Sequence, residues 1–226
     1  MARHAVVTGT SSGIGKAVAS RLLREGWRVT GLDQQAATIV HAGFRAVSVD
    51  LGDDARRRLV ADALDAADAL VHCAGIMRAG RLGEMDLAAG SMLWRIHVEA
   101  AVALADRLAP QMPRGGRIVL IGSRAGGKGV AGKSQYGAAK AALAGLARSW
   151  AKELIARGIT VNVVSPAATE TAMLSDPARD ILPPETPPIG RRIRPDEITA
   201  LVSYLLCPDA DAITGQEISI CGGASL

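Results

Sequence analysis

The chain has 226 residues, of which 49% are apolar and 3% aromatic, and its formal net charge is +4. This length and apolar content predict one globular domain over residues 1–226. The basic residues are dispersed, and few aromatic side chains could stack on bases, so we expect no nucleic-acid partner.

The sequence also bears on membranes and compartment. It contains no run of about 18 uncharged apolar residues, which predicts that no segment spans a membrane. A predicted strand begins almost at the N-terminus and leaves no room for a signal peptide. Three cysteines without scaffold spacing suit a reducing compartment. We therefore expect a cytoplasmic protein.

Short apolar runs alternate with longer stretches at helical spacing along the whole chain. The predicted strands cover residues 5–7, 28–32, 44–50, 69–72, 117–121, 160–164 and 217–220. The predicted helices cover residues 13–25, 53–66, 86–109, 135–157 and 195–206. This alternation predicts an α/β fold with a doubly wound parallel sheet of about seven strands and helices on both faces. Ligands of such a sheet bind beyond the carboxyl ends of its strands.

Three glycines, Gly9, Gly13 and Gly15, lie in the turn between the first predicted strand and helix. Glycine is needed where the backbone takes a positive φ or approaches a pyrophosphate closely, and the N-terminus of the next helix favours that anion. The spacing GxxxGxG departs from the usual dinucleotide fingerprint GxGxxG. This loop alone is therefore a weak indication of a cofactor.

Asp33 ends the second predicted strand, and Gln34 and Gln35 rather than basic residues follow it. A carboxylate at this point can accept hydrogen bonds from both hydroxyls of an adenosine ribose, and it would repel a 2′-phosphate. The residue before the middle glycine is Ser12, which is also uncharged. These residues indicate NAD rather than NADP. The alternative interpretation of Asp33 is a turn or helix-cap residue.

Tyr136 and Lys140 stand four residues apart in YGAAK, and Ser123 ends the stretch RIVLIGS upstream. Positions i and i+4 of a helix lie on one face, which places the ammonium of Lys140 beneath the phenol. A free tyrosine has a pKa of about 10, and a nearby cation in a partly dry cleft stabilises its phenolate. The alternative interpretation is a chance YxxxK on an amphipathic helix.

Together these motifs resemble the short-chain dehydrogenase/reductase family, from Arg3 to Leu226. TGTSSGIG (8–15) looks like the family's cofactor loop, and VNVVSPAATET (161–171) looks like its VNxVxPGxxxT. The resemblance implies a single-domain Rossmann-type fold in which Ser123, Tyr136 and Lys140 are catalytic. It also implies NAD contacts from Gly9, Thr10, Ser11, Ser12, Gly13, Ile14, Gly15, Asp33, Asp50, Leu51, Cys73, Ala74, Gly75, Tyr136, Lys140, Pro166, Ala167, Thr169 and Thr171.

Several positions depart from the family pattern. His72 and Cys73 occupy the two Asn positions of its NNAG motif, Ala167 replaces the Gly of PG, and Cys221 replaces the Asp of DGG. The stretch between residues 33 and 50 is short, which predicts a stunted second helix. No metal-ligand spacing links the histidines and cysteines, so we expect no metal site.

His97 stands where the family carries the Asn of its proton relay. One interpretation is a buried imidazole with its hydrogen bonds satisfied. The other is a catalytic role, because a neutral imidazole both donates and accepts and could hold the water that carries protons from Lys140. Both interpretations stay open at this point.

The resemblance implies an NAD-dependent oxidoreductase that interconverts a secondary alcohol and a ketone, with Tyr136 as general acid/base. AGIMRAG (74–80) resembles sugar-acid dehydrogenases of the family, which favours a small polar or acidic substrate such as a sugar acid. One alternative is a 3-oxoacyl thioester reductase, which usually uses NADPH. The other is a cofactor-binding regulator that has lost catalysis.

The surroundings of this site suggest a substrate lid and an anionic substrate. The Pro-rich stretch 172–194 follows Thr171, and the resemblance implies that it covers the substrate. Basic residues near the expected mouth would attract a carboxylate or phosphate, unless they are solvated or paired with Asp176, Asp180 and Glu185. The basic residues near the expected mouth are Arg78, Arg124, Lys128, Lys133, Arg191, Arg192 and Arg194.

The resemblance also implies a homotetramer or homodimer formed through helices 86–109 and 135–157.

Overall fold

The computed structural model describes residues 2–175 and 185–226. Seven strands form one sheet in the order β3-β2-β1-β4-β5-β6-β7, and every neighbouring pair is parallel. This arrangement confirms the predicted doubly wound α/β fold. The strands are β1 (His4–Thr8), β2 (Arg28–Asp33), β3 (Phe44–Ser48), β4 (Ala69–His72), β5 (Arg117–Ile121), β6 (Thr160–Pro166) and β7 (Glu217–Ile220).

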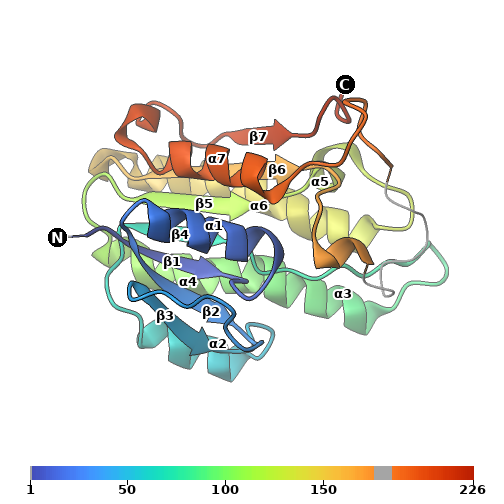
Figure 1. The fold of residues 1–226 in the computed structure, drawn as a ribbon. Helices are drawn as coiled ribbons and strands as arrows, with labels where there is room; N and C mark the ends of the chain where they lie inside the picture. The colour runs from blue at the N-terminus through green and yellow to red at the C-terminus, as the bar shows by residue number, and fades with distance from the viewer. Residues whose placement is uncertain (1, 176–184) are drawn as a thin grey trace.

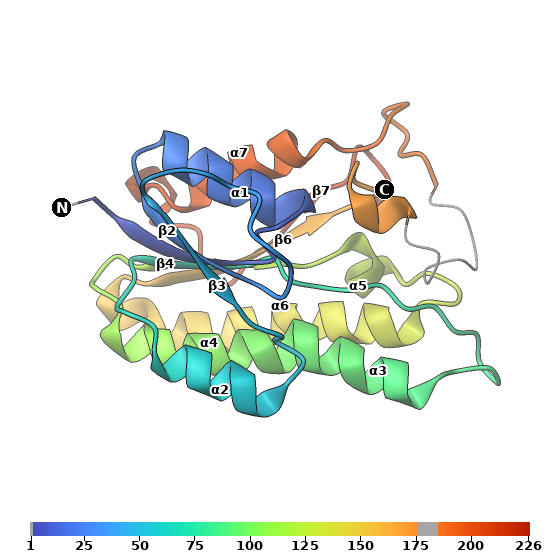
Figure 2. The ribbon, with the colours of Figure 1, turned by 60° about the horizontal axis from the view of Figure 1, so that its bottom comes forward.

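Helices cover both faces of the sheet (Figures 1 and 2). One face carries α1 (Gly13–Arg24) and α7 (Pro195–Leu205), which pack against each other. The other face carries α2 (Asp54–Asp62), α4 (Ala100–Leu108) and α6 (Ser134–Leu154). The helix α3 (Leu87–Trp94) continues the line of α4 beyond the sheet.

Alternation of side chains along each strand divides the core into two layers. Val6 of β1 packs with Leu104 and Leu108 of α4. Its neighbour Val7 faces the other way and packs with Leu22 of α1 and Val202 of α7. Central strands such as β1 and β5 are therefore buried on both faces, which explains their continuous apolar runs, whereas the edge strands β3 and β7 are partly exposed.

The predicted helix 86–109 is interrupted in the structure. A π-helical segment, η1 (Arg95–Glu99), lies between α3 and α4, and a 3-10 turn at Ala109–Gln111 ends the line. By length and composition, Leu87–Gln111 is apolar enough to cross a membrane, although the sequence predicted no span. Core helices of the same composition exist, and Leu93, Leu104 and Leu108 are fully buried here.

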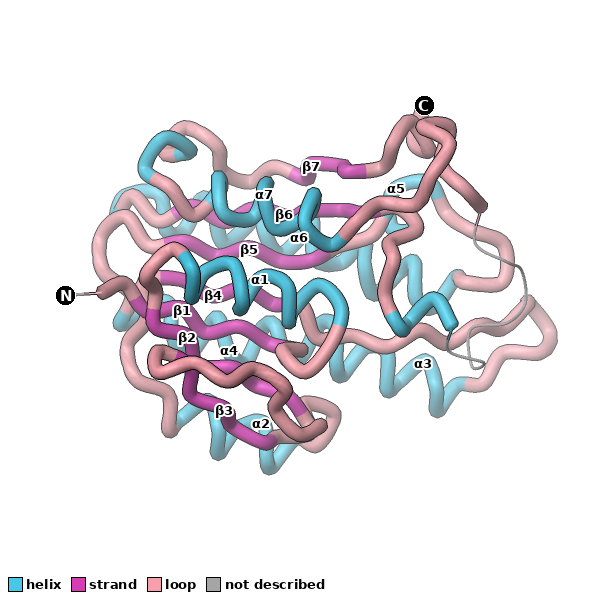
Figure 3. Tube along the Cα trace, viewed as in Figure 1, coloured by secondary structure: helices cyan, strands magenta, loops and turns pink. Residues whose placement is uncertain are grey.

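Other predicted boundaries shift for local reasons. The strand predicted over 44–50 ends at Ser48, because its partner strand β2 ends at Asp33, with which Ser48 is paired. The predicted helix 53–66 ends at Asp62, after which Leu64 turns into the core. The connection 34–43 is a loop without a helix (Figure 3), so the predicted stunted helix is absent altogether.

The region after β6 holds the predicted lid. Residues Ala172–Ser175 form a 3-10 turn, and residues 176–184 of the predicted stretch 172–194 lie outside the described part of the chain. The short helix α5 (Arg124–Lys128) was not predicted. It begins directly after β5, where the hydroxyl of Ser123 accepts a hydrogen bond from the backbone N–H of Ala125 (3.2 Å).

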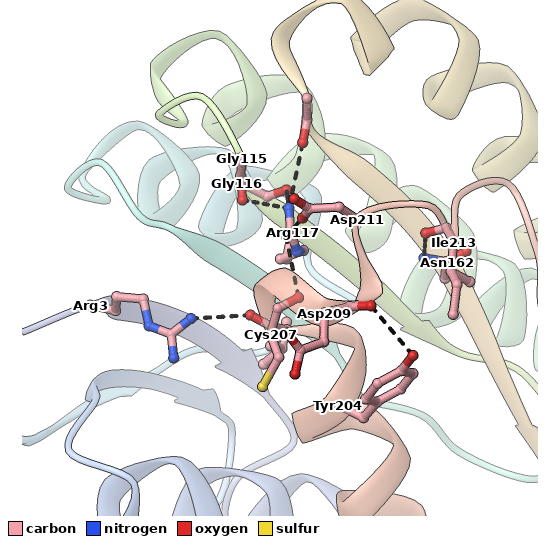
Figure 4. Close-up of polar contacts among 12 residues, drawn as sticks. Arg3, Gly115, Gly116, Arg117, Asn162, Tyr204, Cys207, Asp209, Asp211 and Ile213 are labelled. Atoms are coloured by element: carbon pink, nitrogen blue, oxygen red, sulfur yellow. Dashed lines mark hydrogen bonds and ion pairs between the residues drawn. The ribbon is translucent and has the colours of Figure 1, made fainter.

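A buried cation holds the amino-terminal edge of the sheet together. Arg117 begins β5, and its guanidinium donates to the carbonyl oxygens of Gly115 (2.6 Å), Gly116 (3.1 Å) and Gly158 (3.4 Å). It also forms an ion pair with Asp211 (Figure 4). These contacts join the start of β5 to the turn after α6 and to the C-terminal segment, at the end of the sheet opposite the glycine turn.

Candidate active site

The glycine turn has the close contacts that require glycine. Gly9 has φ +74° and Gly13 has φ +53°, conformations that side chains disfavour. A Cβ on Gly15 would lie 2.2 Å from the carbonyl oxygen of Gly9, so α1 begins directly against the end of β1. The N-cap Ser12 makes no side-chain capping hydrogen bond, which leaves its hydroxyl available at the positive end of α1.

Two residues of the turn face the protein interior instead. Thr10 is buried, and Ser11 donates its hydroxyl to the carbonyl of Gln35 (3.1 Å). The backbone N–H of Ser11 donates to Asp33 (2.9 Å), whose other oxygen accepts from the N–H of Gln35 (2.9 Å). The side chains of Thr10 and Ser11 therefore shape the turn, and any contact they make with a cofactor is through the backbone.

A first cavity, the glycine-turn cavity, has a volume of about 210 Å³. It lies where β1, β2 and β4 end, and no lysine or arginine is among its described lining residues. Asp33 enters it half-buried at the end of β2. The predicted site residues that line it are Gly9, Ser12, Asp33, Asp50, Leu51, Cys73, Ala74 and Gly75.

A second cavity, the tyrosine cavity, has a volume of about 420 Å³ and shares Cys73, Gly75 and Met173 with the first. The predicted site residues that line it are Ile14, Cys73, Gly75, His97, Ser123, Tyr136, Lys140, Pro166, Ala167, Thr169 and Thr171. Residues from β4, η1, β5, α6 and β6 thus meet in one place. Gly13 and Gly15, like Thr10 and Ser11, line neither cavity.

Lys140 and Tyr136 are both buried on one face of α6. The Nζ of Lys140 donates to the carbonyl oxygen of Ile121 (2.6 Å) and lies 5.9 Å from the centre of the Tyr136 ring. Burial lowers the pKa of Lys140 to about 8. The ammonium is thus held close to the phenol in a largely dry site, as the i, i+4 spacing predicted.

His72 supports the turn that the two cavities share. The hydroxyl of Thr8 accepts from the N–H groups of Cys73 (2.9 Å) and Ala74 (2.8 Å), so its own proton is donated to Nδ1 of His72 (3.0 Å). The Nε2–H of His72 then donates to the carbonyl oxygen of Ile96 in η1 (3.1 Å). Burial, followed by the charge of Lys140, lowers the pKa of His72 to about 3, so the imidazole is neutral.

His97 has one engaged and one unengaged ring nitrogen. Its Nε2 lies 2.9 Å from the carbonyl oxygen of Ile76 and 3.3 Å from the backbone nitrogen of the same residue. The shorter contact favours the tautomer with the proton on Nε2, which leaves Nδ1 as an acceptor. Nδ1 is buried without a hydrogen-bond partner among the described residues. The ring packs edge-on to Tyr136 at 5.5 Å, and burial holds the pKa of His97 well below its usual range. Among the described residues the imidazole is thus hydrogen-bonded at one ring nitrogen, and both interpretations of His97 stay predictions.

Sequence reasoning missed several residues of the site. The hydroxyl of Thr8 holds the turn together, and the one sequence feature that could indicate this role is its position directly before Gly9. Met173 lines both cavities, and Met77 and Val130 line the tyrosine cavity. Met173 and Val130 lie outside the quoted motifs, whereas Met77 stands within AGIMRAG (74–80) but was not singled out there.

The predicted basic rim divides into three groups. Arg124 pairs with Glu185 (3.7 Å), as the alternative interpretation held, whereas Arg191 and Arg194 pair with Glu197 (2.8 Å and 3.7 Å), which that interpretation did not name. Arg124 and Lys133 line the tyrosine cavity. Lys128 is exposed, and the predicted partners Asp176 and Asp180 lie outside the described residues.

A larger hollow lies elsewhere among the described residues. It is an open groove of about 980 Å³ between α2 and η1, lined by side chains of both charges such as Asp53, Arg58, Arg95 and Glu99. It contains neither the glycine turn nor Tyr136. The two smaller cavities are the candidate active site, because they join the glycine turn to a buried phenol and ammonium.

Comparison with known proteins covers nearly the whole chain. A protein-family profile described as enoyl-(acyl carrier protein) reductase matches residues 9–225. The 3-oxoacyl-acyl-carrier-protein reductase of Vibrio cholerae is 34% identical over 239 residues, covering 97% of this chain and 96% of that protein. The 2,3-dihydro-2,3-dihydroxybenzoate dehydrogenase of Escherichia coli K12 is 35% identical over 245 residues, with the same coverage of 97% and 96%.

Solved structures give the same result. A short-chain dehydrogenase family protein from Francisella tularensis superposes with a TM-score of 0.90 at 25% identity, covering 99% of this chain and 98% of that one. A blue fluorescent protein from a metagenomic library, solved with NADPH, superposes with a TM-score of 0.87 at 32% identity, covering 99% and 98%.

Proposed function

Because the chain belongs to the short-chain dehydrogenase/reductase family, whose members are oxidoreductases, we propose that it interconverts a secondary alcohol and a ketone on a small acidic substrate with NAD. One observation carries this proposal. Ser123, Tyr136 and Lys140 line a single cavity that continues into the glycine turn. A cofactor-binding regulator without catalysis would have no use for a buried ammonium beside a phenol.

The described residues fit a nicotinamide dinucleotide. The positive φ values of Gly9 and Gly13 let the backbone turn into the N-terminus of α1, which favours a pyrophosphate, and Thr171 lies beside Gly13. Asp33 and Asp50 line the glycine-turn cavity, which supports a role for both in holding the adenosine. When bound, the nicotinamide supplies the acceptor for the hydride that leaves the carbinol carbon.

The choice of NAD rests on Asp33. Its carboxylate would repel a 2′-phosphate, and the glycine-turn cavity has no described basic residue to hold one. The structural relative solved with NADPH shows that the fold also accepts the phosphorylated cofactor. For Asp33→Ser we expect the preference for NAD over NADP, measured as the ratio of kcat/KM, to fall at least tenfold. An unchanged ratio would contradict this role.

In the oxidation, the phenolate of Tyr136 accepts the proton of the substrate hydroxyl, and the hydroxyl of Ser123 orients that oxygen. Lys140 favours the ionised phenol through its charge. We assign Nδ1 of His97 to hold a water that takes protons outward from Lys140, because this buried acceptor has no described partner and its residue lines the same cavity. Ile14, Pro166, Ala167 and Thr169 would line the nicotinamide half of the cofactor.

The substrate class is supported by charge and by similarity. The tyrosine cavity contains more cationic than anionic side chains, which favours an acid. The relative named as a dihydro-dihydroxybenzoate dehydrogenase acts, by that name, on a secondary alcohol of a carboxylated ring. The second candidate is reduction of a 3-oxoacyl thioester, which the reductase of Vibrio cholerae favours.

Assembly and compartment complete the proposal. Trp94 of α3 and Val102 of α4 are exposed apolar side chains on the helices expected to pair, which supports a homotetramer or homodimer. The cysteines Cys73, Cys207 and Cys221 are free, as is usual in the cytoplasm.

The central test is reduction of NAD, followed by absorbance, with a panel of hydroxy acids and uncharged alcohols. A 3-oxoacyl thioester with NADPH is assayed in parallel. We expect oxidation of an acid by the wild type and a loss of roughly 1,000-fold or more in kcat for Tyr136→Phe, with the Kd for NAD within threefold of the wild type. Retained turnover in Tyr136→Phe, or activity confined to the thioester, would overturn the proposal.

A further inference from the structure

The charged side chains of the tyrosine cavity are unequally distributed. Among the described residues that line it, the cations are Arg124, Lys133 and Lys140, and the one anion is Glu185. The mechanism uses Lys140, whereas Arg124 and Lys133 have no part in proton transfer. Lys133 is 8% exposed, so its charge is held inside the cavity wall rather than in bulk water. The two remaining cations therefore need a separate explanation.

Arg124 is held in a fixed orientation beside the catalytic serine. It directly follows Ser123 at the start of α5, and one guanidinium nitrogen, Nη1, donates to the carbonyl oxygen of Ala224 (3.2 Å). The other, Nη2, faces the carboxylate of Glu185 at 3.7 Å. The C-terminal segment thus anchors one edge of the guanidinium and leaves the second edge directed at a carboxylate.

The contact with Glu185 is loose enough to be exchanged. The Glu185 side chain is 85% exposed, whereas that of Arg124 is 22% exposed. An ion pair of this length with a solvated partner contributes little to stability. A planar guanidinium binds a carboxylate well in a bidentate arrangement. Glu185 therefore occupies the place that the carboxylate of a ligand would take.

Part of the cavity wall is apolar, although Ser123, Thr169 and Thr171 are also among the lining residues. Met77, Val130, Met173 and Leu174 line it, and Met77 packs with Tyr136 in one apolar cluster. No Asn, Gln or Asp is among the described lining residues. The several hydroxyls of a sugar would lose their hydrogen bonds to water against such a wall. An apolar ring loses nothing there and gains contact.

We propose that Arg124 and Lys133 form a carboxylate-binding subsite, and that the substrate is a hydroxylated alicyclic acid rather than a sugar acid. The inference rests on the proposed function and narrows its substrate class. Arg124 binds the carboxylate in place of Glu185, and Lys133 adds charge from the start of α6. The apolar wall receives the ring, so that the ring hydroxyl lies toward Ser123 and Tyr136.

The test compares an acid with its neutral analogue. The probes are cis-3-hydroxycyclohexanecarboxylate, the matching carboxamide, and glucuronate, each assayed with saturating NAD. The proteins are the wild type, Arg124→Met, Lys133→Met and the control Lys128→Met. Lys128 lies one turn from Arg124 on α5 but is exposed and is not among the residues lining the cavity, so the control removes the same charge outside the subsite.

We expect the wild type to favour the alicyclic acid over both the carboxamide and glucuronate in kcat/KM. For Arg124→Met, kcat/KM for the acid should fall roughly 10- to 100-fold, mainly through KM, because a charge-assisted hydrogen bond is lost. Lys133→Met should show a smaller loss of the same kind. The carboxamide should change less than threefold in every variant, and Lys128→Met should match the wild type. Equal losses for acid and amide, or faster oxidation of glucuronate, would overturn the proposal.

A binding measurement separates this inference from the proposed function. Benzoate and benzamide are titrated calorimetrically into each protein with NAD present. Benzoate binding that weakens at least tenfold in Arg124→Met, without any alcohol oxidation, supports the subsite while refuting the oxidoreductase proposal. Alcohol oxidation with equal affinity for benzoate in wild type and Arg124→Met supports the enzyme and overturns the subsite.

Discussion

Buried charged groups have different surroundings at the two ends of the sheet, although the same strand, β5, runs from one end to the other. At the amino-terminal edge, both terminal nitrogens of Arg117 have carbonyl or carboxylate partners, while its Nε has none among the described residues. At the carboxyl edge, beyond the same strand, Lys140 has a depressed pKa and Nδ1 of His97 lacks a partner among the described residues. The charge of Arg117 is thus compensated by its neighbours, whereas the charge of Lys140 remains available to groups in the cavity.

The difference shows which end is built for stability and which for chemistry. A guanidinium surrounded by acceptors stabilises the junction of the segments that supply them. An ammonium with few compensating groups lies in a cavity and can act on a neighbouring phenol. Substitutions at the amino edge should therefore change stability alone, and those at the carboxyl edge should change function.

The largest effect is expected at the amino edge. Arg117→Met leaves the carbonyl oxygens of Gly115 and Gly158 without this donor, whereas that of Gly116 keeps the backbone N–H of Thr160, and we expect a loss of about 3–4 kcal/mol in the free energy of unfolding. Urea denaturation measures this loss, and the Kd for NAD of the folded variant should match the wild type. If Arg117→Met kept normal stability but bound NAD more weakly, the assignment of stability to the amino-terminal edge would be contradicted.

The glycine turn provides the matching change at the carboxyl edge. In Gly15→Ala the new Cβ would lie 2.2 Å from the backbone oxygen of Gly9, so the turn must move. We expect NAD affinity to fall about 100-fold, or roughly 2.7 kcal/mol, by calorimetry. The control is Gly145→Ala, at an exposed position of α6 where a new Cβ meets nothing within 4 Å, and its NAD binding should be unchanged. Wild-type affinity in Gly15→Ala would show that the turn does not hold the cofactor.

Buried neutral histidines at the carboxyl edge should make the fold acid-sensitive. The pKa of His72 is about 3 when folded, below its usual 6.5, so the unfolded chain binds the proton first as the pH falls. The neutral imidazole of His72 gives its full contribution to the free energy of unfolding above pH 6.5 and loses it progressively as the pH falls toward 3. By pH 5 about 2 kcal/mol of this contribution should be lost. Urea titrations at pH 7.5 and 5.0 measure the loss, and His72→Asn should reduce it. An equal pH dependence in both proteins would contradict this.

The smallest effect concerns the exposed partner of Arg124. Glu185→Gln removes the carboxylate that competes for the guanidinium, so we expect KM for an alicyclic hydroxy acid to fall about two- to threefold, in line with a weak exposed ion pair. Unfolding free energy should not change. A raised KM would show that Glu185 helps to bind the substrate rather than competing with it.

Much of the fold was predictable because its signals are local. The apolar runs of β1 and β5 are buried on both faces, and such strands read as continuous apolar segments. The break of 86–109 at η1 was not predictable, because a π-helical turn is stabilised by the distant donor His72 rather than by its own composition. The short α5 was missed because five residues give no periodicity.

The spacing of Tyr136 and Lys140, the positions of the glycines and the carboxylate of Asp33 are properties of the sequence by itself, since each depends on neighbours within a few residues. They determined the family and indicated the cofactor. The tertiary structure alone decided the environment of each group. It buried Lys140 and His97, turned Thr10 and Ser11 inward, and brought Arg124 to the wall that holds Met77 and Met173. Those outcomes depend on strands and helices far apart in the chain, and burial by distant segments is what sets charge and specificity in a site.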